Sequence, residues 1–218
     1  MVKNLSNIRG YLTVIPPLLI KKFLWGFLGL LNIFNAFMFK FIYDLDLKQA
    51  LNLYVNAIFF VITLVFDLWA IYILLDTKTK QNQFILFSGL VSFFLSAMYI
   101  YAFYEIIYMI LDIKSLVYIY IIIFLYIFIL ALNLLILHQL LNKGNFKRKK
   151  QKGIFISLIL ICFNFGIMGE KLYNKFSDAR SQLIVTAFII LLFGYCFLFT
   201  THNTYKYYLI KKYSKPSE

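Results

Sequence analysis

Six long apolar runs constrain this chain more than any other feature of its sequence. A helix that crosses a membrane needs about 20 apolar residues to traverse roughly 30 Å of hydrocarbon. The six runs are Phe23–Tyr43, Leu53–Leu75, Phe84–Leu111, Leu116–Leu141, Gly153–Tyr173 and Gln182–Thr204. With 62% hydrophobic and only 14% charged residues, a soluble fold of 218 residues could not bury this much apolar surface. The sequence therefore predicts an all-α integral membrane bundle of six transmembrane helices.

A shorter apolar stretch, Tyr11–Ile20, precedes the first run and contains Pro16 and Pro17. It is too short to span, and two lysines follow it at once. We therefore expect an N-terminal interfacial segment that lies on the inner leaflet. The predicted division is residues 1–22 for the N-terminus with this segment, 23–204 for the transmembrane domain and 205–218 for a basic tail.

The distribution of charge predicts the orientation of the six spans. If the N-terminus is inside, 16 of the 22 Lys and Arg residues fall on the inner side and six on the outer side. The positive-inside rule then predicts a plasma-membrane protein with both termini in the cytoplasm. This alternation of the charged segments requires the fifth run to cross the membrane. The basic connection Asn142–Lys152 is read either as a topology anchor or as a contact for lipid headgroups or a partner. The positive charge sits in short segments between spans, so lipid is expected as a partner and nucleic acid is not.

Two carboxylates and two asparagines inside the predicted spans are candidates for function. An ionisable group within the bilayer is costly and is by default a functional candidate, and Asp67 and Glu105 are of this kind. Glu105 could instead reach the outer interface, and Asp67 could bond to a neighbouring helix or belong to a proton or ion path. Asn32 and Asn35, spaced i, i+3, share one face and are candidate partner-binding residues, because lipid offers amides no hydrogen-bond partner.

The third run carries a ladder of small residues. Ser88, Ser92 and Ser96 recur every four residues, a spacing that lets another helix approach closely. The ladder could serve packing within the monomer or a contact with another subunit. The three serines are therefore further candidates for partner binding.

The chain carries no recognisable catalytic motif. It has no H-E-x-x-H, G-x-S-x-G or Walker sequence and no C-x-x-C. Cys162 and Cys196 lie in apolar runs, and His138 and His202 lie near the ends of spans. We therefore expect neither an enzyme nor a bound cofactor or metal. The many tyrosines at span ends are typical of an aromatic belt at the membrane interface.

With short loops, six spans, a basic inner face and no catalytic motif, the chain resembles the small polytopic membrane proteins of Gram-positive toxin loci. In particular it resembles those encoded beside type VII-secreted toxins in staphylococci. This resemblance implies an immunity protein that protects the producing cell by binding a membrane-targeting toxin within the bilayer, alone or as a homo- or heterodimer formed through transmembrane helices.

An alternative is a permease subunit of a small ABC exporter. Such permeases are similar in having an interfacial segment, six spans and both ends inside, and their loop between the second and third spans docks an ATPase. In this chain that loop, Asp76–Gln83, is short. A membrane-embedded enzyme is the least favoured alternative, because Asp67 and Glu105 lie toward opposite faces of the membrane in the predicted topology.

Overall fold

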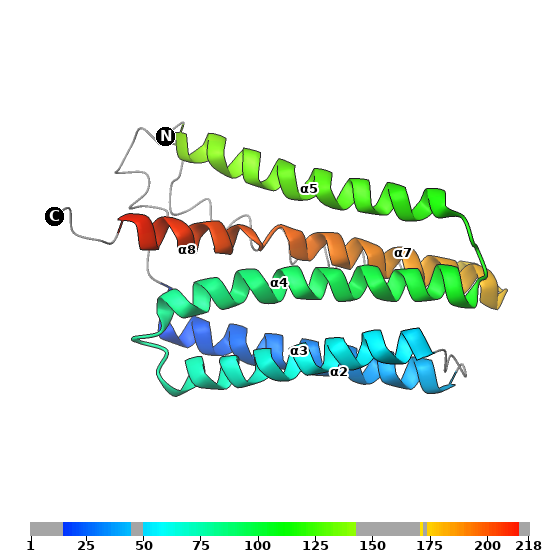
Figure 1. Cartoon of the computed structure of the whole chain (residues 1–218), viewed down its shortest axis with the longest axis horizontal. Helices are drawn as coiled ribbons and strands as arrows, with labels where there is room; N and C mark the ends of the chain where they lie inside the picture. Colours follow the sequence, from blue (N-terminus) through cyan, green and yellow to red (C-terminus); the bar gives the residue numbers. More distant parts are fainter. Residues whose placement is uncertain (1–14, 45–49, 143–170, 172–173, 214–218) are drawn as a thin grey trace. The chain divides into compact units, whose positions relative to one another are not determined.

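The computed structural model describes residues 15–44, 50–142, 171 and 174–213, and these residues are helical apart from their connections. No strand occurs among them. The helices are α2 (Pro17–Asp44), α3 (Ala50–Leu75), α4 (Gln81–Tyr104), the π-helix η1 (Glu105–Ile110), α5 (Leu116–Asn142), α7 (Ala179–Leu198) and α8 (His202–Tyr213), shown in Figure 1.

Five stretches of the described residues are long and apolar enough to cross a membrane. They are Pro17–Lys40, Leu53–Leu75, Gln81–Tyr108, Val117–Gln139 and Ala179–Lys212. They correspond to the first four and the last of the predicted runs, and the second and fourth agree to within a few residues. The predicted fifth run, Gly153–Tyr173, lies outside the described residues except for Lys171. The all-helical class is thus confirmed with five candidate spans.

The first helix begins earlier than the sequence predicts. The carbonyl group of Pro16 accepts hydrogen bonds from the backbone N–H groups of Leu19 (2.9 Å) and Ile20 (3.1 Å). Pro17 occupies the first helical position, where its fixed φ suits a helix. Proline lacks a backbone N–H, but an N–H at this position would have no hydrogen-bond partner within the helix. From Pro17 onward the expected interfacial segment is therefore the first turn of α2, and Ile20 is fully buried.

The third and last predicted runs are not uniform α-helices. The third ends in η1, where the i→i+5 bond from Leu111 N–H to the Ile106 carbonyl is 3.0 Å long. The last divides into α7 and α8, because the hydroxyl groups of Thr200 and Thr201 bond back to the carbonyls of Phe197 and Leu198 at the break. Much of the predicted basic tail is the helix α8.

The chain forms two compact units, and α4 contributes to both. Unit 1 comprises the described residues between 92 and 202, and unit 2 comprises those between 15 and 91 and between 203 and 213. In unit 2, α2 and α3 are antiparallel, as the Phe39–Phe60 ring pair at one end indicates (5.7 Å). Phe87 of α4 packs edge-on against rings of both helices, those of Phe27, Phe66 and Trp69.

In unit 1, α5 and α7 each run antiparallel to the second half of α4. Phe93 and Tyr126 bring α5 against α4 (6.0 Å between ring centroids), and Phe103 and Phe188 bring α7 against it (5.7 Å). Consequently α5 and α7 run in the same direction, as Figure 1 shows. The amide of Asn133 on α5 donates to the Leu198 carbonyl of α7 at 2.9 Å and fastens the two together.

Candidate functional site

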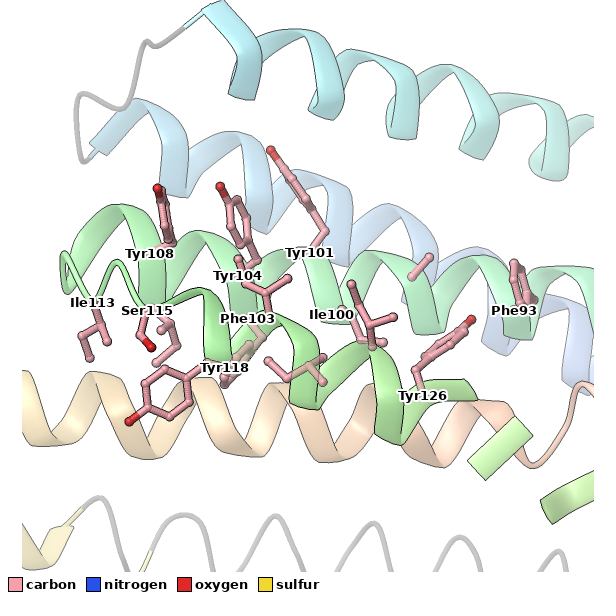
Figure 2. A pocket seen from close by; sticks show the side chains of 15 residues that line it. Phe93, Ile100, Tyr101, Phe103, Tyr104, Tyr108, Ile113, Ser115, Tyr118 and Tyr126 are labelled. Carbon is pink, nitrogen blue, oxygen red and sulfur yellow. The ribbon is translucent and has the colours of Figure 1, made fainter. Parts of the chain in front are cut away.

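An apolar groove lies in unit 1 between α5 and the second half of α4 with η1. Its volume is about 440 Å³, within the roughly 300–1,000 Å³ typical of ligand pockets. Fifteen residues line it (Figure 2). Five of them are tyrosines: Tyr101, Tyr104, Tyr108, Tyr118 and Tyr126. Most of the others are isoleucines and phenylalanines, so the walls are almost entirely carbon.

Three of the tyrosines form one row on α4 and η1. Tyr101, Tyr104 and Tyr108 recur at i, i+3 and i+7, a spacing that places side chains on one helix face. The rings of Tyr104 and Tyr108 stack with centroids 5.1 Å apart, and those of Tyr101 and Tyr104 lie 6.2 Å apart. Their hydroxyl groups point the same way in Figure 2, so the row presents carbon faces to the groove.

The short turn between η1 and α5 forms one end of the groove. Asp112 has a φ of 53°, in the left-handed region that aspartate tolerates better than most residues. Its carboxylate pairs with the Lys114 ammonium at 2.7 Å, and this pair raises the pKa of that ammonium. The turn therefore reverses the chain tightly while Ser115 and Tyr118, just beyond it, line the groove.

The length and lining of the groove indicate what it can hold. Phe93 and Tyr108, which line it, are 15 positions apart on one helix, or about 22 Å. Along this length the lining is almost entirely apolar, so the groove suits a row of large apolar side chains or a hydrocarbon chain.

Glu105 lies beside the groove as the first residue of η1. Its side chain is fully buried, so it does not extend to an exposed interface as one sequence interpretation had it. It interacts with Tyr101 one turn earlier, which lines the groove. π-Helical turns are frequent at functional sites, and this one places a carboxyl group directly behind the aromatic wall.

The polar residues predicted on the first two spans meet each other in unit 2. The Asn32 amide donates to Oδ2 of Asp67 at 3.0 Å, and the Asn35 amide donates to the Thr63 hydroxyl at 2.6 Å. The asparagine face thus contacts α3 of the same chain. Oδ1 of Asp67 is buried and accepts no hydrogen bond from the described residues.

The serine ladder is used for packing within the chain. Ser88, Ser92 and Ser96 are all buried. In unit 2 the Asn203 amide of α8 donates to the Ser88 hydroxyl at 3.0 Å. In unit 1 Gly194 of α7 packs against the Ser96 carbonyl, 3.4 Å from where a Cβ would lie. Ser88 and Ser96 thus contribute to packing within the monomer, and a contact of the ladder with another subunit stays a prediction.

The groove itself has only a weak signal in the sequence. Tyrosines near span ends are expected from an aromatic belt alone, and the spacing of Tyr101, Tyr104 and Tyr108 is the feature that distinguishes a row on one face. Among the described residues, no group of three or more His, Cys, Asp or Glu side chains is placed to hold a metal ion.

In comparisons with known proteins, no protein-family model, curated protein or solved structure matches the chain. The class of protein follows from the helices themselves. Five helices of this length and composition in one chain define an all-helical, multi-pass membrane protein.

Proposed function

We propose that this chain is an immunity protein of the plasma membrane that protects its producer by binding the hydrophobic segment of a membrane-targeting toxin within the bilayer. The groove between α4 and α5 is the observation that supports this proposal. It is a preformed apolar recess, whereas the exposed apolar side chains of α3, such as Leu64, Leu68 and Ile71, line no such recess.

The physics of the bilayer favours a recess of this kind for recognition. Lipid tails are as apolar as leucine, so no hydrophobic driving force draws one transmembrane helix to another. Affinity then depends on close packing, in which each well-placed atom pair adds only about 0.1–0.2 kcal/mol. A groove that takes a row of side chains offers many such contacts at once, and its tyrosine rings supply rigid surfaces.

We propose six spans with both termini in the cytoplasm, and the directions of α5 and α7 support this count. Ile110, Leu111 and Asp112 line a second cavity of unit 1 together with Arg180 and Leu183, so α7 starts where α5 starts. Two helices that cross a membrane in the same direction need an odd number of crossings between them. One crossing between Asn142 and Ala179 agrees with the charge distribution of 16 basic residues inside and six outside.

The exporter alternative receives less support. The connection between α3 and α4 is a closed turn, in which the Asp76 carboxylate accepts from the Thr79 hydroxyl at 2.6 Å. The Lys80 ammonium donates back to the Tyr72 carbonyl at 2.8 Å and lies 3.3 Å from the Tyr72 ring centroid. A turn of this size offers an ATPase little surface to dock on.

The test is protection of sensitive cells. Cells with and without the protein are exposed to the secreted medium of a strain that carries the gene, and membrane depolarisation is followed with a voltage-sensitive dye. We expect the protein to prevent depolarisation, and Ala97→Trp, which fills the groove, to abolish this protection. Leu135→Trp adds the same ring to an exposed site of α5 outside the groove and should leave protection unchanged.

Two results would contradict the proposal in different ways. If the unaltered chain gives no protection, the immunity function is wrong. If both tryptophan variants protect as well as the unaltered chain, the function stands but the groove is not where the toxin binds.

A further inference from the structure

Unit 2 brings three separate parts of the chain to one end. The ring pairs Phe23–Phe84 and Phe27–Phe87, each 6.2 Å apart, show that α2 and α4 run in the same direction. The first turn of α8 meets Ser88 and Gly89, and from there α8 runs opposite to α4 in Figure 1. The start of α2, the α3–α4 turn and the end of α8 therefore lie at the same end of unit 2.

This end of unit 2 carries an excess of positive charge. We call it the lysine end, and its members are Lys21, Lys22, Lys78, Lys80, Lys211 and Lys212. Among the described residues of these segments the only carboxylate is that of Asp76. Six ammonium groups against one carboxylate leave a net charge of +5.

The carboxylate of Asp76 accepts hydrogen bonds from residues of the turn in which it lies. Asp76 accepts hydrogen bonds from the Thr79 hydroxyl and from the backbone N–H groups of Thr79 (3.3 Å) and Lys78 (3.2 Å). The bond from the Thr79 hydroxyl, with the backbone bonds, holds the pKa of Asp76 below its usual range. Asp76 thus stabilises its own turn and interacts electrostatically with Lys80, while Lys21, Lys22, Lys78, Lys211 and Lys212 are exposed.

Aromatic side chains border the lysine end. Tyr72 and Tyr208 are about half exposed and lie under the ammonium groups of Lys80 and Lys212, at 3.3 and 5.9 Å from their ring centroids. Tyrosines in such positions mark the headgroup level of a membrane protein. Trp25, 66% exposed, lies one turn after Lys21 and Lys22 on α2, toward the middle of the span.

We propose that the lysine end of unit 2 is a binding site for an anionic phospholipid, with the headgroup phosphate held by lysines from α2, the α3–α4 turn and α8. A ligand that satisfies this surface must carry negative charge directly above apolar chains. An anionic phospholipid has that arrangement, whereas an acidic protein or a nucleic acid would leave the exposed ring of Trp25 without an apolar partner. This inference does not depend on the proposed immunity function.

The experiment measures lipid binding to the full-length protein in detergent by native mass spectrometry. Phosphatidylglycerol and phosphatidylcholine with identical acyl chains are titrated, with inorganic phosphate as a competitor. A lysine near an anionic membrane contributes enough to change affinity about fivefold. We therefore expect phosphatidylglycerol to bind at least about tenfold more tightly than phosphatidylcholine, with no displacement by millimolar phosphate.

Matched variants locate the site. Lys21→Gln/Lys22→Gln/Lys211→Gln/Lys212→Gln should weaken phosphatidylglycerol binding at least about tenfold. The control removes four lysines that lie outside the lysine end, Lys40→Gln/Lys114→Gln/Lys171→Gln/Lys175→Gln, and should bind as the unaltered chain does. If the fourfold variant is not helical by circular dichroism, the single Lys78→Gln variant in the exposed turn serves instead, with a loss of about fivefold.

Three outcomes would overturn the proposal. The first is equally tight binding of the two lipids. The second is displacement of phosphatidylglycerol by inorganic phosphate, which would show an anion site without lipid selectivity. The third is an equal loss in the lysine-end variant and its control, which would show a dependence on total charge and not on this site.

Discussion

The side-chain amide of Asn32 on α2 donates a 3.0 Å hydrogen bond to Oδ2 of Asp67 on α3, within two stretches long enough to cross a membrane. One turn along, Asn35 and Thr63 form a second rung at 2.6 Å. The two rungs use residues spaced i, i+3 on α2 and i, i+4 on α3. They therefore fix both the rotation and the register of this helix pair, which is the main packing unit around Phe87.

A double-mutant cycle should measure the first rung. Because the unfolded chain in a membrane also finds partners, hydrogen bonds between transmembrane helices contribute only about 0.6 kcal/mol on average and about 1.7 at most. We expect a coupling free energy in this range between Asn32→Ala and Asp67→Ala, measured by reversible unfolding in mixed micelles. Strictly additive effects would show that the hydrogen bond contributes nothing to stability.

Glycine substitutions should distinguish the close helix contacts from open surface. A Cβ on Gly89 would lie 2.6 Å from the backbone nitrogen of Thr204, and one on Gly194 would lie 3.1 Å from Cβ of Tyr99. We expect Gly89→Ala to destabilise the fold by about 1–3 kcal/mol through overpacking, and Gly194→Ala by less. Gly26→Ala is the control, because nothing lies within 4 Å of the added carbon.

The outcome of these substitutions is read from unfolding in detergent and from helix content. Gly26→Ala should be neutral or stabilising by about 0.5–1 kcal/mol, the ordinary gain of replacing a helical glycine. Equal behaviour of Gly89→Ala and Gly26→Ala would be incompatible with the tight approach of α8 to α4.

The extent of the spans could be predicted from the sequence, but the way the helices face could not. The runs are recognisable because lipid selects for apolar length, and α3 and α5 begin and end close to the predicted residues. In a membrane, however, residues that face lipid and residues that face the protein are both apolar. Fully buried Phe87 and the exposed Phe124 therefore look alike in the sequence.

Because lipid-facing and protein-facing residues look alike in the sequence, the groove is the part of the site that was hardest to predict. It exists because α4 and α5 meet at Phe93 and Tyr126 but leave space between Tyr104 and Ile119, which is a property of two helices together. Polar residues were easier to interpret, because Asn32 and Asp67 each need a partner that lipid cannot provide. The break between α7 and α8 was missed because Thr200 and Thr201 are too few to interrupt an apolar pattern.

The start of α7 should be sensitive to acid. The Asp178 carboxylate caps the helix by accepting from the Ser181 backbone N–H at 2.8 Å. Hydrogen bonds from the Ser181 side chain and backbone lower the pKa of Asp178 below its ordinary value of about 3.9. A lowered pKa means that the cap is fully present above about pH 4 and is lost as the pH falls through the lower value in the folded chain.

Hydrogen exchange of the Ser181 amide checks this cap. Its protection should fall with acidification below about pH 4 in the unaltered chain. Asp178→Asn keeps an uncharged oxygen that can cap equally well, so its protection should not depend on pH. An identical dependence of protection on pH in the unaltered chain and in Asp178→Asn would contradict the assignment of the carboxylate as the cap.

The parallel course of α5 and α7 predicts which ends of the helices share one side of the membrane. Ser115 precedes α5 and Ser177 precedes α7, while Asn82 lies exposed in the first turn of α4. In a chain whose Cys162 and Cys196 are replaced by serine, Ser115→Cys and Ser177→Cys should both react with a membrane-impermeant maleimide applied to intact cells. Asn82→Cys should react only after permeabilisation, because α4 crosses between it and Ser115. Labelling of Ser115→Cys and Ser177→Cys from opposite sides would require an even number of crossings between α5 and α7 and would exclude the six-span topology.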